Sequence, residues 1–206
     1  PQNRQFILAM EALLDYNEHK IGDEQFVKLD TEALRYTIGS EDVIRNKNVY
    51  LTEMEIKCIR NRWKGLEKNR KIEDIKFLLD IYHKYSLKNE IANAISMYEF
   101  VTEGAVSELG NLGEHELAIQ IDRQSIKESL KCRRLVHMDY KLYDILWNKQ
   151  EMANEKEDKA DLKEMADELK SCISISHYTK RFFYEKIYRD KLVNVHCQDY
   201  PEYHCK

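Results

Sequence analysis

The chain has 206 residues, a formal net charge of −4 and 34% charged residues, but only two prolines and six glycines. Scarce proline and glycine argue against sheets, whose turns depend on both. The slight negative charge argues against a domain that binds nucleic acid by itself. No apolar run reaches the about 18 residues of a membrane span, and no signal peptide is visible. The composition therefore predicts an all-α protein with no membrane partner.

The first helices are predicted from apolar spacing. Residues 4–21 place four apolar side chains on one helical face, and residues 23–38 place four on another. Gly22 separates these two helices, and Gly39-Ser40 ends the second. The inward positions are expected to be Phe6, Met10, Leu13 and Leu14 in the first helix and Phe26, Leu29, Ala33 and Leu34 in the second.

The next hairpin has the clearest start. Thr52 and Glu55 have the spacing of a capping box, in which each side chain accepts a hydrogen bond from the other residue's backbone amide. A partner helix follows, with apolar residues repeating from Ile72. Residues 89–112 then predict one long helix or two in tandem. In its middle, Gly104-Ala105 would weaken an isolated helix, so we expect another helix to cross closely there.

The stretch "ELGNLGEHELAIQI" (residues 108–121) contains Gly110 and Gly113, which allow two interpretations. A phosphate-binding loop would need a preceding strand and a suitably placed lysine, but the residues before Gly110 read as helix and no lysine follows until Lys127. A glycine turn followed by Ala118 is typical of tetratricopeptide-like (TPR-like) helical repeats. We therefore expect antiparallel helical hairpins stacked into a divergent, TPR-like right-handed superhelix.

The C-terminal part is predicted to continue this pattern. Residues 149–160 are highly charged and lack bulky apolar groups, so we expect a mobile loop there. The repeat domain is expected to span residues 1–195, followed by a polar tail over residues 196–206. The odd number of cysteines, three of them in apparent helices, is typical of a reducing compartment and predicts a cytoplasmic protein.

Two C-terminal segments contain residue patterns that could indicate a metal site or a dimer surface. The tail "HCQDYPEYHC" carries His196, Cys197, His204 and Cys205, but adjacent His-Cys pairs do not match common zinc-site spacing, and we expect no metal site. The segment "KRFFYEKIY" predicts a capping helix packed on the stack, with a dimer surface as the alternative. No catalytic arrangement can be placed, so we expect neither an enzyme nor a bound cofactor.

The run "YEFVTEGAVSELGNLGEHELAIQIDRQSIKESLKCRRL", together with "LYDILWN" and "ELKSCISISHYTKRFFYEKIYRDKL", resembles the C-terminal region of Xre-type helix-turn-helix regulators of Gram-positive bacteria. These include the peptide-sensing regulators of the Rgg and PlcR kind. The resemblance is clearest over residues 51–193. It implies a TPR-like sensor domain that forms homodimers, binds a small effector such as a secreted oligopeptide, and controls an N-terminal DNA-binding domain.

This chain departs from that pattern because no helix-turn-helix is visible ahead of residue 4. We expect that the DNA-binding domain is absent from this chain. The regulator would then contact DNA only through that missing N-terminal domain. The alternative is a stand-alone TPR-like adaptor that holds another protein without touching DNA. The sequence does not decide whether a dimer forms through the C-terminal helices or elsewhere.

A curved helical stack offers a groove lined by the first helix of each hairpin. Asparagine can satisfy the amides and carbonyls of a bound peptide, because its side chain both donates and accepts. Polar residues at four-residue spacing are therefore the candidates, and the family's groove asparagines favour Asn111 and Asn148 among them; the alternative is that these residues form solvated faces, with the two asparagines as helix C-caps. The predicted ligand-binding residues are Asn61, Glu103, Ser107, Asn111, His137, Asp144 and Asn148, with Lys57 and Lys141 on the same stripes.

Overall fold

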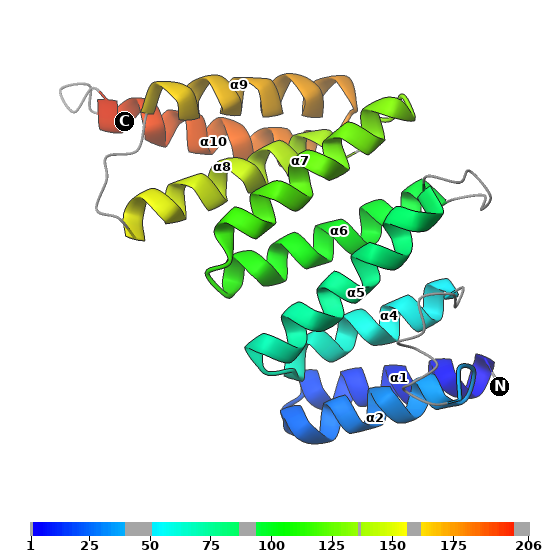
Figure 1. Cartoon of the computed structure of the whole chain (residues 1–206). Coiled ribbons are helices and arrows are strands. Elements are labelled where there is room, and N and C mark those ends of the chain that lie inside the picture. Colours follow the sequence, from blue (N-terminus) through cyan, green and yellow to red (C-terminus); the bar gives the residue numbers. More distant parts are fainter. Residues whose placement is uncertain (1, 40–50, 87–93, 136, 156–161, 200–206) are drawn as a thin grey trace. The chain divides into compact units, whose positions relative to one another are not determined.

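The computed structural model describes residues 2–39, 51–86, 94–135, 137–155 and 162–199 (Figure 1). For residues 82–86, 94, 162 and 196–199 it describes the helical backbone but not the side chains. The described residues form helices and short connections, with no strand among them, and the helices pack against their neighbours. The prediction of an all-α, repeat-like fold is confirmed. The chain divides into two compact units, Pro1–Gly104 and Ala105–Lys206.

The first unit consists of two hairpins and most of a further helix. Helices α1 and α2 pack together, and α2 also packs against α4 and the short 3-10 turn η1. The core of this unit contains Phe26, Ile59 and Trp63, all with almost no exposed surface. Its elements are α1 (Gln2–Asn17), α2 (Asp23–Arg35), α4 (Glu53–Arg62), η1 (Trp63–Gly65), α5 (Lys68–Ser86) and the larger part of α6 (Ala94–Asn111).

The second unit begins within α6 and contains the remaining helices. Helix α8 packs against both α7 and α9, and α10 packs along α9. Its core is built around Leu146, Leu169, Cys172 and Tyr188, which come from α8, α9 and α10. The elements are α7 (His115–Lys131), α8 (Met138–Glu155), α9 (Leu162–Tyr178) and α10 (Phe182–Asp199).

Local sequence signals placed several of these elements correctly. Thr52 accepts a hydrogen bond from the Glu55 amide, and the Glu55 carboxylate accepts one from the Thr52 amide at 2.6 Å, so the capping box at the start of α4 is confirmed. In α2, Phe26, Ala33 and Leu34 are buried as expected, and Leu29 is half-buried. These signals succeed because they depend on residues only three or four positions apart.

The predicted inward face of α1 is wrong. Phe6, Met10 and Leu14 are exposed, and Leu13 is half-buried. The buried residues of α1 are Gln5, Ala9 and Ala12, which lie on another face of the helix. Small side chains let two helix backbones approach closely, so the Ala9 and Ala12 face packs in the unit while the bulky apolar face remains outside.

Gly104 lies in α6 where the sequence predicts a close helix crossing. A Cβ at this position would collide with the guanidinium group of Arg60 from α4. That guanidinium lies over the Phe100 ring, 3.9 Å from the ring centroid. The glycine therefore leaves room for a cation–π contact between the two helices.

Gly113 ends α6 by a Schellman motif. Its φ angle is +76°, and its amide donates to the Gly110 carbonyl at 3.0 Å, while the Glu114 amide donates to the Leu109 carbonyl at 2.9 Å. This pair of bonds satisfies carbonyls that a helix end leaves open. The glycines therefore close a turn between helices, and in this structure neither begins a phosphate-binding loop.

The predicted loop over residues 149–160 is wrong in its first part, because α8 continues to Glu155. The segment contains Glu151, Met152 and Ala153, residues with good helix propensity, and these three are half-buried. Residues 156–160 lie outside the described part of the chain. Similarly, α10 runs to Asp199, into the expected tail. A high fraction of charge suits an exposed helix as well as a loop, so composition alone did not distinguish them.

Membrane spans were sought among the helices of the described residues. None of these helices is both long enough and apolar enough to cross a bilayer.

Candidate functional site

The predicted ligand-binding residues are divided between the two units. In the first unit, Asn61 and Glu103 are half-buried, and exposed Lys57 forms an ion pair with Glu53 at 2.6 Å. In the second unit, Ser107 and Asn111 are exposed on α6. The remaining predicted residues belong to the segment from His137 to Asn148, in or next to α8.

Within that segment, the side chains are less open than the prediction requires. His137 and Asp144 are half-buried, and Lys141 is fully buried, with its ammonium donating to the Ser129 hydroxyl of α7 at 2.8 Å. These contacts tie α8 to its neighbours. Four-residue spacing on α8 therefore marks a face that is partly internal to the unit.

The prediction that Asn148 faces an open groove is wrong. The alternative, that Asn148 is a helix C-cap, is wrong as well. Its side chain is 1% exposed in the middle of α8, where its oxygen lies 2.9 Å from His115 Nδ1 and its amide donates to the Asp144 carbonyl at 2.8 Å. A Cβ on Gly110 would lie 2.7 Å from the Trp147 ring. Gly110, His115 and Asn148 thus form an internal joint where the α6–α7 turn meets α8.

Replacing Asn148 by alanine tests this structural role. The His115 ring would lose a buried partner, so we expect the free energy of unfolding to fall by about 1–3 kcal/mol. Asn111→Ala is the matched control, because Asn111 is exposed, and its effect should stay within about 0.5 kcal/mol. Urea unfolding followed by circular dichroism measures both. Equal effects of the two substitutions would contradict the buried role of Asn148.

A cleft of about 320 Å³ lies between α8, α9 and α10, entirely within the second unit. Its volume is at the lower end of the range for small-molecule sites. The apolar part of its lining is Tyr143, Leu146, Trp147, Met165, Leu169 and Val195. The polar part is Gln150, Glu151, Asn154, Lys191 and Asn194. The cleft therefore combines an apolar surface with three side-chain amides and two opposite charges.

The apolar lining belongs to a well-packed part of the molecule. Leu146, Met165, Leu169 and Val195 are members of the unit's buried core, and Tyr143 packs against it with its ring 5.1 Å from that of Tyr188. Burial is the main cause that raises the pKa of the Tyr143 phenol, so this group stays neutral at physiological pH. A ligand in the cleft would meet a preformed apolar wall.

The polar lining is available for a ligand. Within the described part of the chain, none of its five side chains forms a hydrogen bond or an ion pair with another residue. Glu151 and Lys191 in particular line the same cleft without pairing with each other. In contrast, Lys149 on the neighbouring face of α8 is held by Glu164 at 2.7 Å and Glu168 at 2.8 Å.

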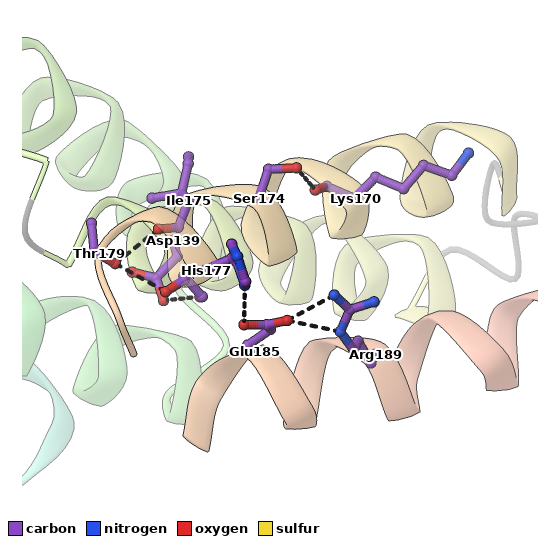
Figure 2. Close-up of polar contacts among 9 residues, drawn as sticks. Asp139, Lys170, Ser174, Ile175, His177, Thr179, Glu185 and Arg189 are labelled. Carbon is purple, nitrogen blue, oxygen red and sulfur yellow. Dashed lines mark hydrogen bonds and ion pairs between the residues drawn. The ribbon is translucent and has the colours of Figure 1, made fainter. Parts of the chain in front are cut away.

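A polar cluster ties α8 to the turn between α9 and α10 (Figure 2), whereas the cleft is lined by the first part of α9 and the last part of α10. Buried Asp139 of α8 accepts from the Ser176 hydroxyl at 2.5 Å and from Arg181. Glu185 of α10 accepts two hydrogen bonds from Arg189, at 2.7 and 3.0 Å, and lies 3.1 Å from His177 of α9. The Arg189 bonds are the main cause that lowers the pKa of Glu185. The serine faces a carboxylate and not a histidine, so the cluster orients helices and does not resemble a nucleophile with its base.

Sequence reasoning missed this cleft because it assigned the last two turns of α8, from residue 149 onward, to a loop. Trp147, Gln150, Glu151 and Asn154 follow the i, i+3, i+4, i+7 spacing of one helical face, and Lys191, Asn194 and Val195 repeat part of it. If α8 is extended to Glu155, the spacing identifies the same face. None of the predicted ligand-binding residues lines the cleft, and its amide side chains lie on α8 and α10.

Metal binding has no support from the described residues, among which no three His, Cys, Asp or Glu side chains gather as a metal site would require. The tail motif is not tested by this observation. No side chain is described for His196 and Cys197, and His204 and Cys205 lie outside the described residues.

In comparisons with protein-family models, with curated proteins and with solved structures, no match to this chain was found.

Proposed function

We propose that this chain is the effector-sensing and dimerisation domain of a transcriptional regulator, and that its effector is an oligopeptide bound in the α8–α10 cleft. The observation that carries the proposal is the lining of the cleft. Three amide side chains, Gln150, Asn154 and Asn194, have no partner within the described residues and lie beside an apolar wall. The resemblance of the sequence to peptide-sensing regulators supports the same assignment.

The chemistry of the cleft suits a peptide better than an apolar metabolite or an anion. A peptide in an extended conformation presents unpaired amides and carbonyls, and an asparagine or glutamine side chain can both donate to it and accept from it. Apolar side chains of the ligand would be buried against Leu146 and Val195, and Glu151 and Lys191 can each pair with an opposite charge. A phosphate-rich ligand would meet only one cation in this lining.

Such a site can act as a switch because it joins different helices. A peptide that contacts Asn154 on α8 and Asn194 on α10 stabilises one spacing of these two helices over others. Effector binding then shifts the population toward that conformation, by no more than the difference in affinity for the two states. In a regulator, this shift would be passed to the DNA-binding domain.

A random peptide library tests peptide binding while the effector is still unidentified. The full chain is incubated with random heptapeptides with free termini, and bound peptides are recovered and sequenced by mass spectrometry. We expect binders with at least one apolar residue. The double variant Asn154→Ala/Asn194→Ala should weaken them about tenfold or more, since each lost hydrogen bond costs about 0.5–1.5 kcal/mol. Asn111→Ala is the matched control outside the cleft. No recoverable binder, or binders insensitive to the double variant, would count against the proposal.

The adaptor is the second candidate function, and a different measurement separates it from the regulator. The native gene product in its own cells should carry a basic helix-turn-helix domain ahead of the present sequence, and its intact mass should exceed the 24.7 kDa of this chain. A native product of the same mass would favour the adaptor.

A further inference from the structure

The outer face of α1 carries a stripe of exposed apolar side chains. Phe6, Ile7, Met10 and Leu14 are between 36% and 54% exposed. On a helix of 3.6 residues per turn these positions lie along one side, and exposed Asn3 and Asn17 end the stripe. Soluble proteins expose isolated apolar side chains freely, but a contiguous stripe of this kind usually marks a contact surface.

Two charged residues border the stripe along one edge. Arg4 and Glu11 are exposed, seven residues apart, and therefore on the same side of the helix. Neither forms an ion pair within the described residues, although Arg4 lies over the Tyr36 ring at 5.7 Å. The other carboxylates of this segment, Asp15 and Glu18, both pair with Lys20.

We infer that a second copy of this chain covers the stripe, with the two α1 helices packed antiparallel. In an antiparallel pair, the same edge of both helices meets, so Arg4 of each copy lies on the side of Glu11 of the other. Two reciprocal ion pairs then flank one apolar seam, as the self-complementarity of a twofold interface requires. In a parallel pair these charges would not face each other. The inference deepens the dimerisation part of the proposed function, on which it rests, and it does not depend on peptide binding.

The charges favour α1 over a second exposed apolar surface, at the turn between α9 and α10. Tyr178, Phe182 and Phe183 are more than half exposed there. The exposed side chains without a partner in the described residues that lie nearest these rings along the chain are Lys180 and Lys186, and the first such carboxylate, Asp190, comes one turn further along α10. Two copies would bring these lysines close to those of the partner at this surface, and their repulsion opposes self-association. The α1 edge, in contrast, carries one charge of each sign.

One helix of this length offers less surface than the about 800 Å² per partner of a standard interface. We therefore expect a dimer that dissociates in the micromolar range, and its affinity should fall with added salt because the charge pairs lie at the rim.

Sedimentation velocity of the full chain from 1 to 200 µM, with and without 0.5 M NaCl, tests the assignment. We expect a monomer–dimer equilibrium in the wild type. Ile7→Glu/Leu14→Glu should give a monomer with unchanged circular dichroism, because both side chains are already exposed in the monomer. Glu11→Arg should raise the dissociation constant on the order of tenfold, and Arg4→Glu/Glu11→Arg should restore it to near the wild-type value. Phe183→Ser is the matched control at the other surface and should leave the equilibrium unchanged.

The possible outcomes distinguish the assignment of the dimer contact to α1 from the proposal that the chain forms a dimer. A wild type that stays monomeric at 200 µM would overturn both the α1 contact and the dimerisation part of the proposed function. A dimer that survives Ile7→Glu/Leu14→Glu but is lost in Phe183→Ser would overturn only the α1 contact. A charge exchange that fails to restore affinity would overturn the antiparallel arrangement.

Discussion

Replacing Asp30 by asparagine is expected to make the first unit more stable at pH 8 by about 4 kcal/mol and to change its stability little near pH 4. Asp30 lies on α2 with no exposed surface, and neither carboxylate oxygen has a hydrogen-bond partner among the described residues. Burial, opposed by the charges of Arg62 and Lys64, raises the pKa of this carboxyl to about 7 from the ordinary value of 3.8.

The direction of the pH effect follows from these two values. Below about pH 3 the carboxyl is protonated in the folded and the unfolded chain, so it adds no pH dependence. Between pH 4 and pH 7 the unfolded chain loses the proton while the folded chain keeps it, and stability falls as the pH rises. Above pH 7 the folded chain holds an ionised, buried carboxylate, and the loss has reached about 1.4 kcal/mol for each unit of the pKa difference. Asparagine carries no charge at any pH, so the variant should lack this fall.

The measurement needs a signal from the first unit alone. Trp63 lies in that unit and Trp147 in the other, so a Trp147→Phe background makes fluorescence report on Trp63. Urea unfolding at pH 4.5, 6, 7 and 8 then compares Asp30→Asn with its parent. Glu24→Gln, an exposed carboxylate on the same helix, is the control and should follow the parent. Parallel profiles for Asp30→Asn and the parent would show that Asp30 is solvated or paired in the folded protein.

The sequence predicted the features of this fold that depend on near neighbours along the chain. The capping box at Thr52 and the glycine turn at Gly113 each require only a few adjacent residues. The inward face of α1, in contrast, depends on the partner helix. Hydrophobicity favoured Phe6 and Leu14, but close packing selected the small residues Ala9 and Ala12. Periodicity identifies the faces of a helix, and the partner decides which face is buried.

The candidate site shows the same limit. Asn148 has the residue type and spacing of a groove residue, but its partner is His115, 33 positions away, and no local pattern reveals this contact. The cleft residues Gln150 and Asn154 were accessible to sequence reasoning in principle, since their helical spacing is regular. They were missed because a charged segment was assigned to a loop, although its residues favour a helix.

Replacing Asp74 by alanine is expected to cost about 3–5 kcal/mol, because it would remove the carboxylate that pairs with the buried guanidinium of Arg62. Arg62 of α4 and Asp74 of α5 form an ion pair at 2.6 Å, with both side chains only 5% exposed. The double variant Arg62→Met/Asp74→Leu removes both charges and keeps apolar volume, so it should recover most of the loss. The fluorescence assay of Trp63 measures both variants, and equal destabilisation by the single and double changes would contradict a buried, paired charge.

Asp74→Ala should also change the titration of Asp30, which separates the loss of the ion pair from a simple loss of packing. Arg62 already lowers the pKa of Asp30 by its charge, against the larger effect of burial. Without Asp74, the guanidinium has Asp30 as an alternative carboxylate partner, and the ionised form of Asp30 becomes more favourable. The pH-dependent fall in stability should then be smaller than in the parent, and the loss caused by Asp74→Ala should be greater at pH 5 than at pH 8. In the Asp30→Asn background that difference should vanish. If it persists there, another group is responsible for the pH dependence, and the coupling of Asp30, Arg62 and Asp74 is wrong.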